Sequence, residues 1–245
     1  MLDEAAALRI SQSAVGRTLP DFGFRDSRHK AVRLADFRGK PLVVNFVYTA
    51  CYHTCPLVVQ TLARAVGMAQ DALGADSFNV ITIGFDARAD TPSRMRAYAQ
   101  QQGIDLPNWR FLSADAATID ALAAEIGFVF YPSTRGFDHL AQTTVVDPEG
   151  VIYRQIYGSD FGPQALVEPL KMMALGQSGS LVSVAGIVER VRLFCTVYDP
   201  NSERYRFDYS IFVGAIIGAA SLAGVGIIVF RAWRRQKFAG RVQPR

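Results

Sequence analysis

Two of the chain's three cysteines, Cys51 and Cys55, lie four residues apart. The apolar run Leu42–Tyr48 before them has the length and composition of a buried strand, and the periodic pattern Leu57–Leu73 after them predicts a helix. Pro56 lacks a backbone N–H, so it suits the first turn of that helix, where this donor would have no partner. We therefore expect both cysteines in the loop where a strand turns into a helix.

This position favours reactive sulfurs. Residues four apart are separated by about one helical turn, so the two sulfurs can face the same way. Backbone N–H groups and the positive end of the helix dipole favour thiolate over thiol. A thiolate pair at a strand-to-helix turn either exchanges disulfides or holds a soft metal, and the spacing leaves both chemistries open.

Histidine decides between the two chemistries. His139 precedes the apolar segment Gln142–Val146, which we expect to be a strand. In a thioredoxin-like topology the loop before this strand faces the start of the cysteine-bearing helix. Cys51, Cys55 and His139 would then present two sulfurs and one nitrogen, a set that selects Cu(I), or zinc and, once oxidised, Cu(II). Asp138 would orient the imidazole, and the alternative for His139 is a surface loop histidine.

Two further residues carry open alternatives. His53, between the cysteines, is a fourth or substitute ligand, a cation that raises thiolate content, or an exposed loop histidine, and we favour the last. Cys195 lies sixteen residues before a long apolar segment. It is a resolving thiol, an intermolecular bridge or a buried inert residue, and we expect the last.

Strands and helices alternate along most of the chain. The strands that we expect are 42–48, 78–85, 109–112, 142–146 and 151–157, and the helices are 57–73, 93–102, 116–126, 163–175 and 181–194. Strand–helix repeats followed by a hairpin and a helix predict a central sheet covered by helices on both faces, an α/β fold of the thioredoxin-like class. The expected units are a helical arm 1–15, a thioredoxin-like domain 16–177, a juxtamembrane helix and linker 178–210, a transmembrane helix 211–230 and a basic cytoplasmic tail 231–245.

The net charge of +4 belongs to the C-terminal end of the chain. After Ile211 there are six basic residues and no acidic one, which leaves 20 basic and 22 acidic residues upstream, a balance of −2. The main domain therefore lacks the basic footprint of nucleic-acid binding, and no nucleic-acid partner is expected.

Ile211–Phe230 is expected to cross a lipid bilayer. It is an uncharged run of twenty residues, close to the ~20 that a helix needs to span the hydrocarbon core. Tyr209 and Trp233 suit the two interfaces, and the basic cluster beyond them predicts a cytoplasmic C-terminus. The main domain is then on the periplasmic side of the inner membrane, held by a single span. Met1–Gly16 lacks the apolar region of an export signal, so we expect that the true start lies upstream or that the signal has been removed; a cytoplasmic tail-anchored protein is the alternative.

Three blocks, in order, resemble the Sco/SenC family of membrane-anchored copper chaperones for cytochrome c oxidase assembly. They are Cys-x-x-x-Cys-Pro after a strand, the segment Asp86–Pro92, and Asp138-His139 followed by Asp147–Gly150. The resemblance covers Gly16–Leu175. It implies that Cys51, Cys55 and His139 bind a copper ion, that the cysteine pair can also cycle to a disulfide, and that the copper-bearing subunit of cytochrome c oxidase is the partner.

The resemblance also has limits. Asp86, Arg88 and Asp90 match a family block beside the site, with Asp86 as a candidate supporting residue, but a salt-bridged turn that caps the next helix explains them equally well. The anchor here is C-terminal, whereas familiar members carry theirs at the N-terminus. Gly214 and Gly218 allow helix pairing and hence a homodimer.

The competing reading is a thiol–disulfide oxidoreductase that acts on partner cysteines. Its usual motif is Cys-x-x-Cys, and it leaves His139 without a task. A peroxidase-like reading fails because Thr49 and Cys51 have the wrong spacing. We expect a metallochaperone rather than a turnover enzyme.

Overall fold

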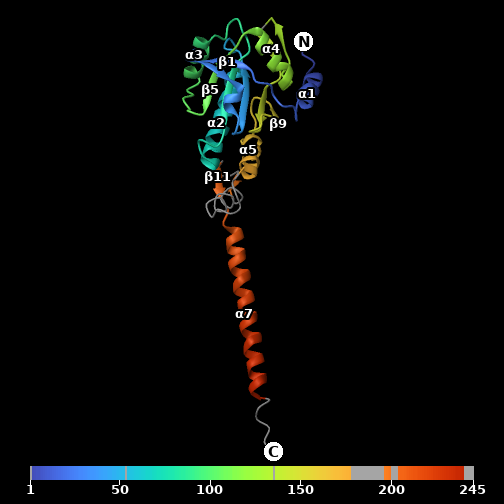
Figure 1. Ribbon diagram of the computed structural model, residues 1–245, viewed down its shortest axis with the longest axis vertical. Helices are drawn as coiled ribbons and strands as arrows, with labels where there is room; N and C mark the ends of the chain where they lie inside the picture. Colours follow the sequence, from blue (N-terminus) through green and yellow to red (C-terminus); the bar gives the residue numbers. More distant parts are fainter. Residues whose placement is uncertain (1, 53, 135, 178–195, 200–203, 240–245) are drawn as a thin grey trace, which may run out of the picture.

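The computed structural model describes residues 2–52, 54–134, 136–177, 196–199 and 204–239 (Figure 1). The helices are α1 (Glu4–Ser13), the short 3₁₀ helix η1 (Leu34–Phe37), α2 (Thr54–Leu73), α3 (Pro92–Gln101), α4 (Ala116–Ile126), α5 (Gln164–Gln177) and α7 (Ser210–Ala239). The strands are β1 (Gly23–Asp26), β2 (Ala31–Arg33), β3 (Leu42–Val47), β4 (Asn79–Gly84), β5 (Trp109–Ser113), β6 (Phe130–Ser133), β7 (Gly136–His139), β8 (Gln142–Val146), β9 (Ile152–Tyr157), β10 (Thr196–Asp199) and β11 (Arg204–Phe207).

One seven-stranded sheet forms the centre of the domain, in the order β2-β1-β5-β4-β3-β8-β9. The strands β3, β4 and β5 are parallel, while β8 runs antiparallel to β3 and β9 antiparallel to β8. Every residue of β3 is buried, which requires cover on both faces of the sheet. The expected α/β fold with flanking helices is confirmed, and β3 delivers the chain to the cysteine loop from its centre.

Helix α1 belongs to the globular domain. Its Ala7 and Ser11 are buried, and the Ser11 hydroxyl donates to the Gln142 side chain at 2.9 Å while accepting from the Tyr157 hydroxyl at 2.8 Å. These bonds fasten α1 to the β8–β9 edge of the sheet. The first turn of α1 is thereby held near the site described below.

Three segments differ from the sequence-based expectation. Helix α2 begins at Thr54 rather than Leu57, because Pro56 fits its first turn. Phe130–Ser133 and Gly136–His139 pair as the small antiparallel hairpin β6–β7, which is absent from the expected strands. A second unexpected hairpin, β10–β11, lies between α5 and α7. The helix expected over 181–194 falls outside the described residues.

The β10–β11 hairpin docks on the domain through α5 and α2. The Lys171 ammonium donates to the Thr196 carbonyl at 2.6 Å, and the Tyr205 hydroxyl donates to Glu168 at 3.2 Å. Helix α7 starts three residues after β11 and leaves the domain at the end where α2 finishes (Figure 1). The cysteine-bearing start of α2 is at the opposite end of that helix, about 30 Å away for its 20 residues.

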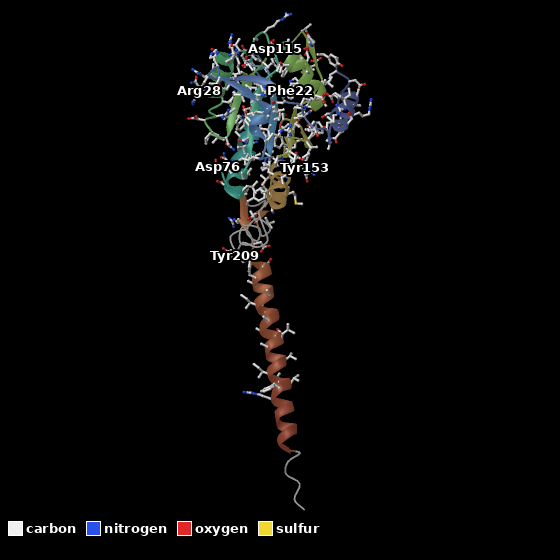
Figure 2. All side chains as sticks on the ribbon, viewed as in Figure 1. Phe22, Arg28, Asp76, Asp115, Tyr153 and Tyr209 are labelled. Carbon is white, nitrogen blue, oxygen red and sulfur yellow. The ribbon has the colours of Figure 1, made fainter. Side chains whose placement is uncertain are left out.

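Helix α7 contains a segment, Phe212–Arg231, that is long and apolar enough to cross a membrane. Figure 2 shows its side chains projecting outward along the helix beyond Tyr209, clear of the domain. Large apolar residues such as Ile216 and Leu222 are about 70% exposed or more, at 69% and 77%. A soluble core helix would bury such residues, so this segment is a candidate membrane anchor.

Candidate functional site

The cysteines lie at the turn from β3 into α2. The Cys51 amide closes a turn onto the Tyr48 carbonyl at 3.0 Å, and the Cys55 amide donates to the Cys51 sulfur at 3.3 Å. Both residues carry thiols in this structure. The expected contact between the first-turn backbone of the helix and a sulfur is therefore present.

The two thiols have unequal environments. Cys55 is only 2% exposed, whereas Cys51 is half-buried and lines a groove. The hydrogen bond with Cys51 and, next, burial raise the pKa of the Cys55 thiol. A buried sulfur beside a second sulfur is hard to ionise without a cation, so Cys55 stays a thiol in the metal-free site. Cys51 is the sulfur that solvent can reach.

His139 ends β7 and joins the same groove. Its Nδ1 lies 2.8 Å from the Leu140 carbonyl oxygen. A carbonyl only accepts, so Nδ1 carries the hydrogen and Nε2 keeps its lone pair. Burial lowers the pKa of His139, which favours the neutral imidazole that a metal requires. The expected metal-ligating form of this side chain is thus prepared by its backbone partner.

Aromatic rings hold the imidazole and the sulfur in place. The His139 ring contacts Phe85 and Phe128 with centroids at 5.3 and 5.5 Å, and Tyr48 at 6.2 Å. Burial and a hydrogen bond with Cys51 raise the pKa of Tyr48 to about 12. Its hydroxyl therefore stays protonated and touches the sulfur. Sequence reasoning missed Tyr48, although its place three residues before Cys51 was a usable signal.

The β6–β7 hairpin closes over Tyr48 at a glycine. Gly136 has φ of 115°, and a Cβ added there would lie 2.8 Å from the Tyr48 hydroxyl oxygen. The hairpin thus needs glycine both for its backbone conformation and for its approach to the ring. This contact brings Phe137, Asp138 and His139 to the edge of the groove.

The groove itself has a volume of about 370 Å³. Its lining is shared by four parts of the chain, namely Leu2 and Glu4, Tyr48 and Cys51, Thr54, and Phe137 to His139. Asp138, the expected neighbour of the ligand, therefore lies in the lining. Glu4 adds a second carboxylate, and nothing in the sequence pointed to it, because it comes from the far N-terminal helix.

Asp90, rather than Asp86, ties the neighbouring loops together. The buried Asp90 carboxylate accepts from the Thr49 amide at 2.8 Å, the Thr49 hydroxyl at 2.7 Å and the Asp86 amide at 2.9 Å. Burial raises its pKa despite these donors. The Asp86 carboxylate accepts from the Arg88 amide at 3.3 Å, and Thr91 caps α3. Asp90 thus fixes the residue two positions before Cys51.

The expected ligands are brought together in part. Cys51 adjoins Cys55, and His139 shares the groove with Cys51, but no three His, Cys, Asp or Glu side chains of the described residues are close enough to hold a metal ion. A three-ligand site would need the side chains to move toward one another. His53 and Cys195 lie outside the described residues, so their alternatives remain predictions.

The similarity of this chain to known proteins extends over the residues of the site. Residues 11–175 match the SCO1/SenC family. A SCO1 protein homolog of Bacillus subtilis is 24% identical over 148 residues, which cover 58% of this chain and 75% of the relative. The structure of ScoI from Bradyrhizobium japonicum with copper bound is 25% identical, covers 64% of this chain and 99% of its own, and gives a TM-score of 0.54.

A structure of BsSco, described as a member of the Sco family of cytochrome c oxidase assembly proteins with a disulfide switch, is also similar. It is 19% identical, covers 65% of this chain and 94% of its own, and gives a TM-score of 0.57. At this identity the likeness concerns the fold alone. The family match contains the cysteine turn, the Asp86–Asp90 segment and His139.

Proposed function

The chain belongs to the SCO1/SenC family, and on that basis we propose that it is a membrane-anchored copper chaperone whose cargo ion is held by Cys51, Cys55 and His139. The observation that carries the proposal is the groove shared by Cys51 and His139, in which Nε2 keeps its lone pair. Sulfur and imidazole donors are the set that Cu(I) prefers. The copper-bound Bradyrhizobium relative supports the identity of the metal.

The burial pattern suits transfer rather than storage. Cys55 is enclosed, while Cys51, His139 and the carboxylates Glu4 and Asp138 border the open groove. An incoming ligand from a partner can therefore approach from the groove side before any resident donor leaves. A set of three donors leaves a coordination position for that ligand. This is the chemistry of a carrier that passes its ion on.

We further propose that α7 anchors the domain in the inner membrane with its basic C-terminal end in the cytoplasm. The β10–β11 hairpin sets the domain above the span, so the cysteine end of α2 is directed away from the bilayer. BsSco is described as a member of the Sco family of cytochrome c oxidase assembly proteins, so the proposed acceptor is the copper-bearing subunit of that oxidase. The site would meet this partner on the periplasmic side.

A second function rests on the unequal thiols. The half-buried Cys51, as thiolate, can attack a partner's disulfide, which forms a mixed disulfide and releases one partner thiolate; the buried Cys55 can then attack the Cys51 sulfur, which closes the Cys51–Cys55 disulfide and releases the reduced partner. The disulfide switch of BsSco supports such cycling. Thiol exchange and copper carriage use the same sulfurs, and they differ in their need for His139.

An anaerobic Cu(I) competition titration on the reduced full chain in neutral detergent tests the proposal. We expect one tightly bound ion per chain and a loss of at least tenfold in affinity in His139→Asn. The matched control is His29→Asn, which removes an imidazole on the β1–β2 turn, where φ of 64° suits Asn. The control should bind as the parent does.

Equal binding by all three proteins would remove His139 from the site. Thiol exchange would then be the leading function. In that case both histidine variants should reduce a model disulfide at the parental rate, while Cys51→Ser should be inactive.

A further inference from the structure

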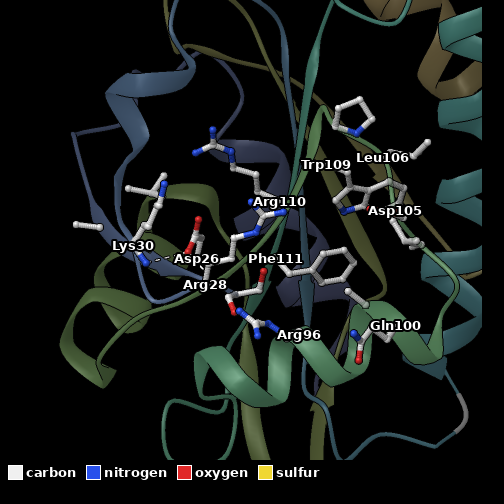
Figure 3. Close-up of a pocket in the computed structure, with 16 residues that line it drawn as sticks. Asp26, Arg28, Lys30, Arg96, Gln100, Asp105, Leu106, Trp109, Arg110 and Phe111 are labelled. Atoms are coloured by element: carbon white, nitrogen blue, oxygen red, sulfur yellow. Dashed lines mark hydrogen bonds between the residues drawn. The ribbon is translucent and has the colours of Figure 1, made fainter.

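A second groove runs along α3, β5 and the β1–β2 turn (Figure 3). Its volume is about 670 Å³. Four cationic side chains from three elements line it, namely Arg28, Lys30, Arg96 and Arg110. Figure 3 shows these cations at one end and apolar residues, among them Leu106 and Phe111, at the other. None of these residues has a task in the proposed copper site.

The cations of this groove are not neutralised by the domain. Ion pairs found among the described residues involve none of the four. Two carboxylates line the groove, and that of Asp26 is occupied by the backbone amides of Arg28 and Lys30 at 2.8 and 2.9 Å. The other, Asp105, lies at the apolar end. The groove therefore carries a local excess of positive charge, whereas the chain before Ile211 has a net charge of −2.

Two of the cations are held in position before any ligand arrives. The Arg96 Nε donates to the Ser27 carbonyl at 2.9 Å, and the Arg110 guanidinium lies 5.7 Å from the centre of the Phe37 ring. Positioned guanidinium groups lose less rotational freedom when they bind carboxylates, and they bind them in a two-point geometry. The groove is thus built to receive oxyanions.

We propose that this groove docks an acidic segment of a partner protein, with carboxylates at the cationic end and an apolar side chain over Leu106. All four cations are exposed and come from three elements, so they face a ligand laid along the groove rather than one enclosed by it. Trp109 and Phe111, which also line the groove, are buried. A groove of about 670 Å³ with cations at one end and apolar residues at the other matches an extended acidic peptide better than a compact phosphate. The proposal does not depend on copper.

The test is fluorescence anisotropy of a labelled six-residue peptide of Glu, Asp and Leu, titrated with the full chain in neutral detergent. We expect saturable binding that weakens in Arg96→Gln/Arg110→Gln by about tenfold and falls with added salt. Arg9→Gln/Arg154→Gln is the matched control, since it removes two exposed cations elsewhere. Its affinity should stay within twofold of the parent.

A second variant, Lys30→Glu, should weaken the peptide on its own, because it reverses a charge without touching α3 or β5. Equal weakening in the groove and control variants, or no binding to the parent, would overturn the proposal. So would displacement of the peptide by inorganic pyrophosphate below millimolar concentration, which would indicate a small oxyanion site. Tighter binding of the parent to phosphatidylglycerol vesicles than to the peptide, lost in the groove variant, would assign the groove to lipid and also overturn it.

Discussion

The substitution Gly84→Ala should disturb both the stability of the domain and the cysteine loop. Gly84 ends β4, and a Cβ added there would overlap the Cβ of Asp90 and lie 2.8 Å from the Met95 sulfur. Met95 is fully buried and Asp90 is 1% exposed, so neither side chain can move into solvent. The Asp90 carboxylate must shift, and its bonds to Thr49 stretch.

The expected cost follows from two contributions. Forcing one methyl group into a packed core costs about 1–3 kcal/mol. Breaking one hydrogen bond to the buried carboxylate adds about 1.5–3 kcal/mol. Alanine also lowers the conformational entropy of the unfolded chain, which offsets about 0.4–1 kcal/mol of this loss. The net loss is then about 3 kcal/mol, a large part of the ~5–15 kcal/mol of an ordinary domain.

Urea unfolding followed by tryptophan fluorescence measures this loss. In a Trp233→Phe background the signal comes from Trp109, whose ring nitrogen donates to Thr82 in β4 at 2.9 Å. Gly67→Ala, in the open middle of α2 with nothing within 4 Å of the added Cβ, is the matched control and should stabilise the domain by about 0.5–1 kcal/mol. An unfolding free energy for Gly84→Ala within about 0.5 kcal/mol of the parent would refute the packing argument.

Two further predictions concern His139 and the membrane-side hairpin. Burial lowers the pKa of His139, so the neutral ring contributes its full stability to the metal-free chain above pH 6.5, and this contribution is lost as the pH falls toward the lowered pKa. In urea titrations, His139→Phe should therefore lose less stability than the parent between pH 7.5 and 5.5. An equal loss in both proteins would contradict this. Lys171→Met removes the 2.6 Å hydrogen bond to the Thr196 carbonyl and should destabilise the β10–β11 hairpin by about 1 kcal/mol. Amide hydrogen exchange over 196–199 should then be roughly fivefold faster. Unchanged exchange would show that other contacts hold the hairpin.

The sheet and its helices could be predicted because local signals agree there. Helix α4 was expected with the observed bounds, since Asp115 caps its start by accepting from the Thr118 amide and Gly127 ends it in the left-handed conformation. The buried strands β3 and β4 were expected within about two residues because their apolar runs are continuous. In each case the pattern and the end signals lie within one segment.

The β6–β7 hairpin was missed because Pro132 and Gly136 resemble loop residues. Pairing between Pro132 and Phe137 depends on packing against Tyr48, which no local pattern encodes. Likewise, β10–β11 is held by Lys171 and Glu168 on another element. Contacts between distant segments determine both hairpins, so a reading of one segment at a time could not find them.

Part of the site was predictable for the same reason. The adjoining cysteines follow from spacing and the helix start, and the proximity of His139 to Cys51 follows from the topology. The role of Asp90 was predicted only in part. The resemblance pointed to the segment Asp86–Asp90, but it did not indicate which of the two carboxylates is buried. The contribution of Glu4 to the groove depends on where α1 docks, which the sequence did not indicate.

X-ray absorption at the copper edge of the Cu(I)-loaded full chain tests the proposed site most directly. We predict two sulfur neighbours and one imidazole nitrogen, with the nitrogen signal lost in His139→Asn and retained in His29→Asn. A spectrum with sulfur neighbours only in the parent, or one in which the imidazole signal survives in His139→Asn, would contradict the assignment of Cys51, Cys55 and His139 as the copper ligands.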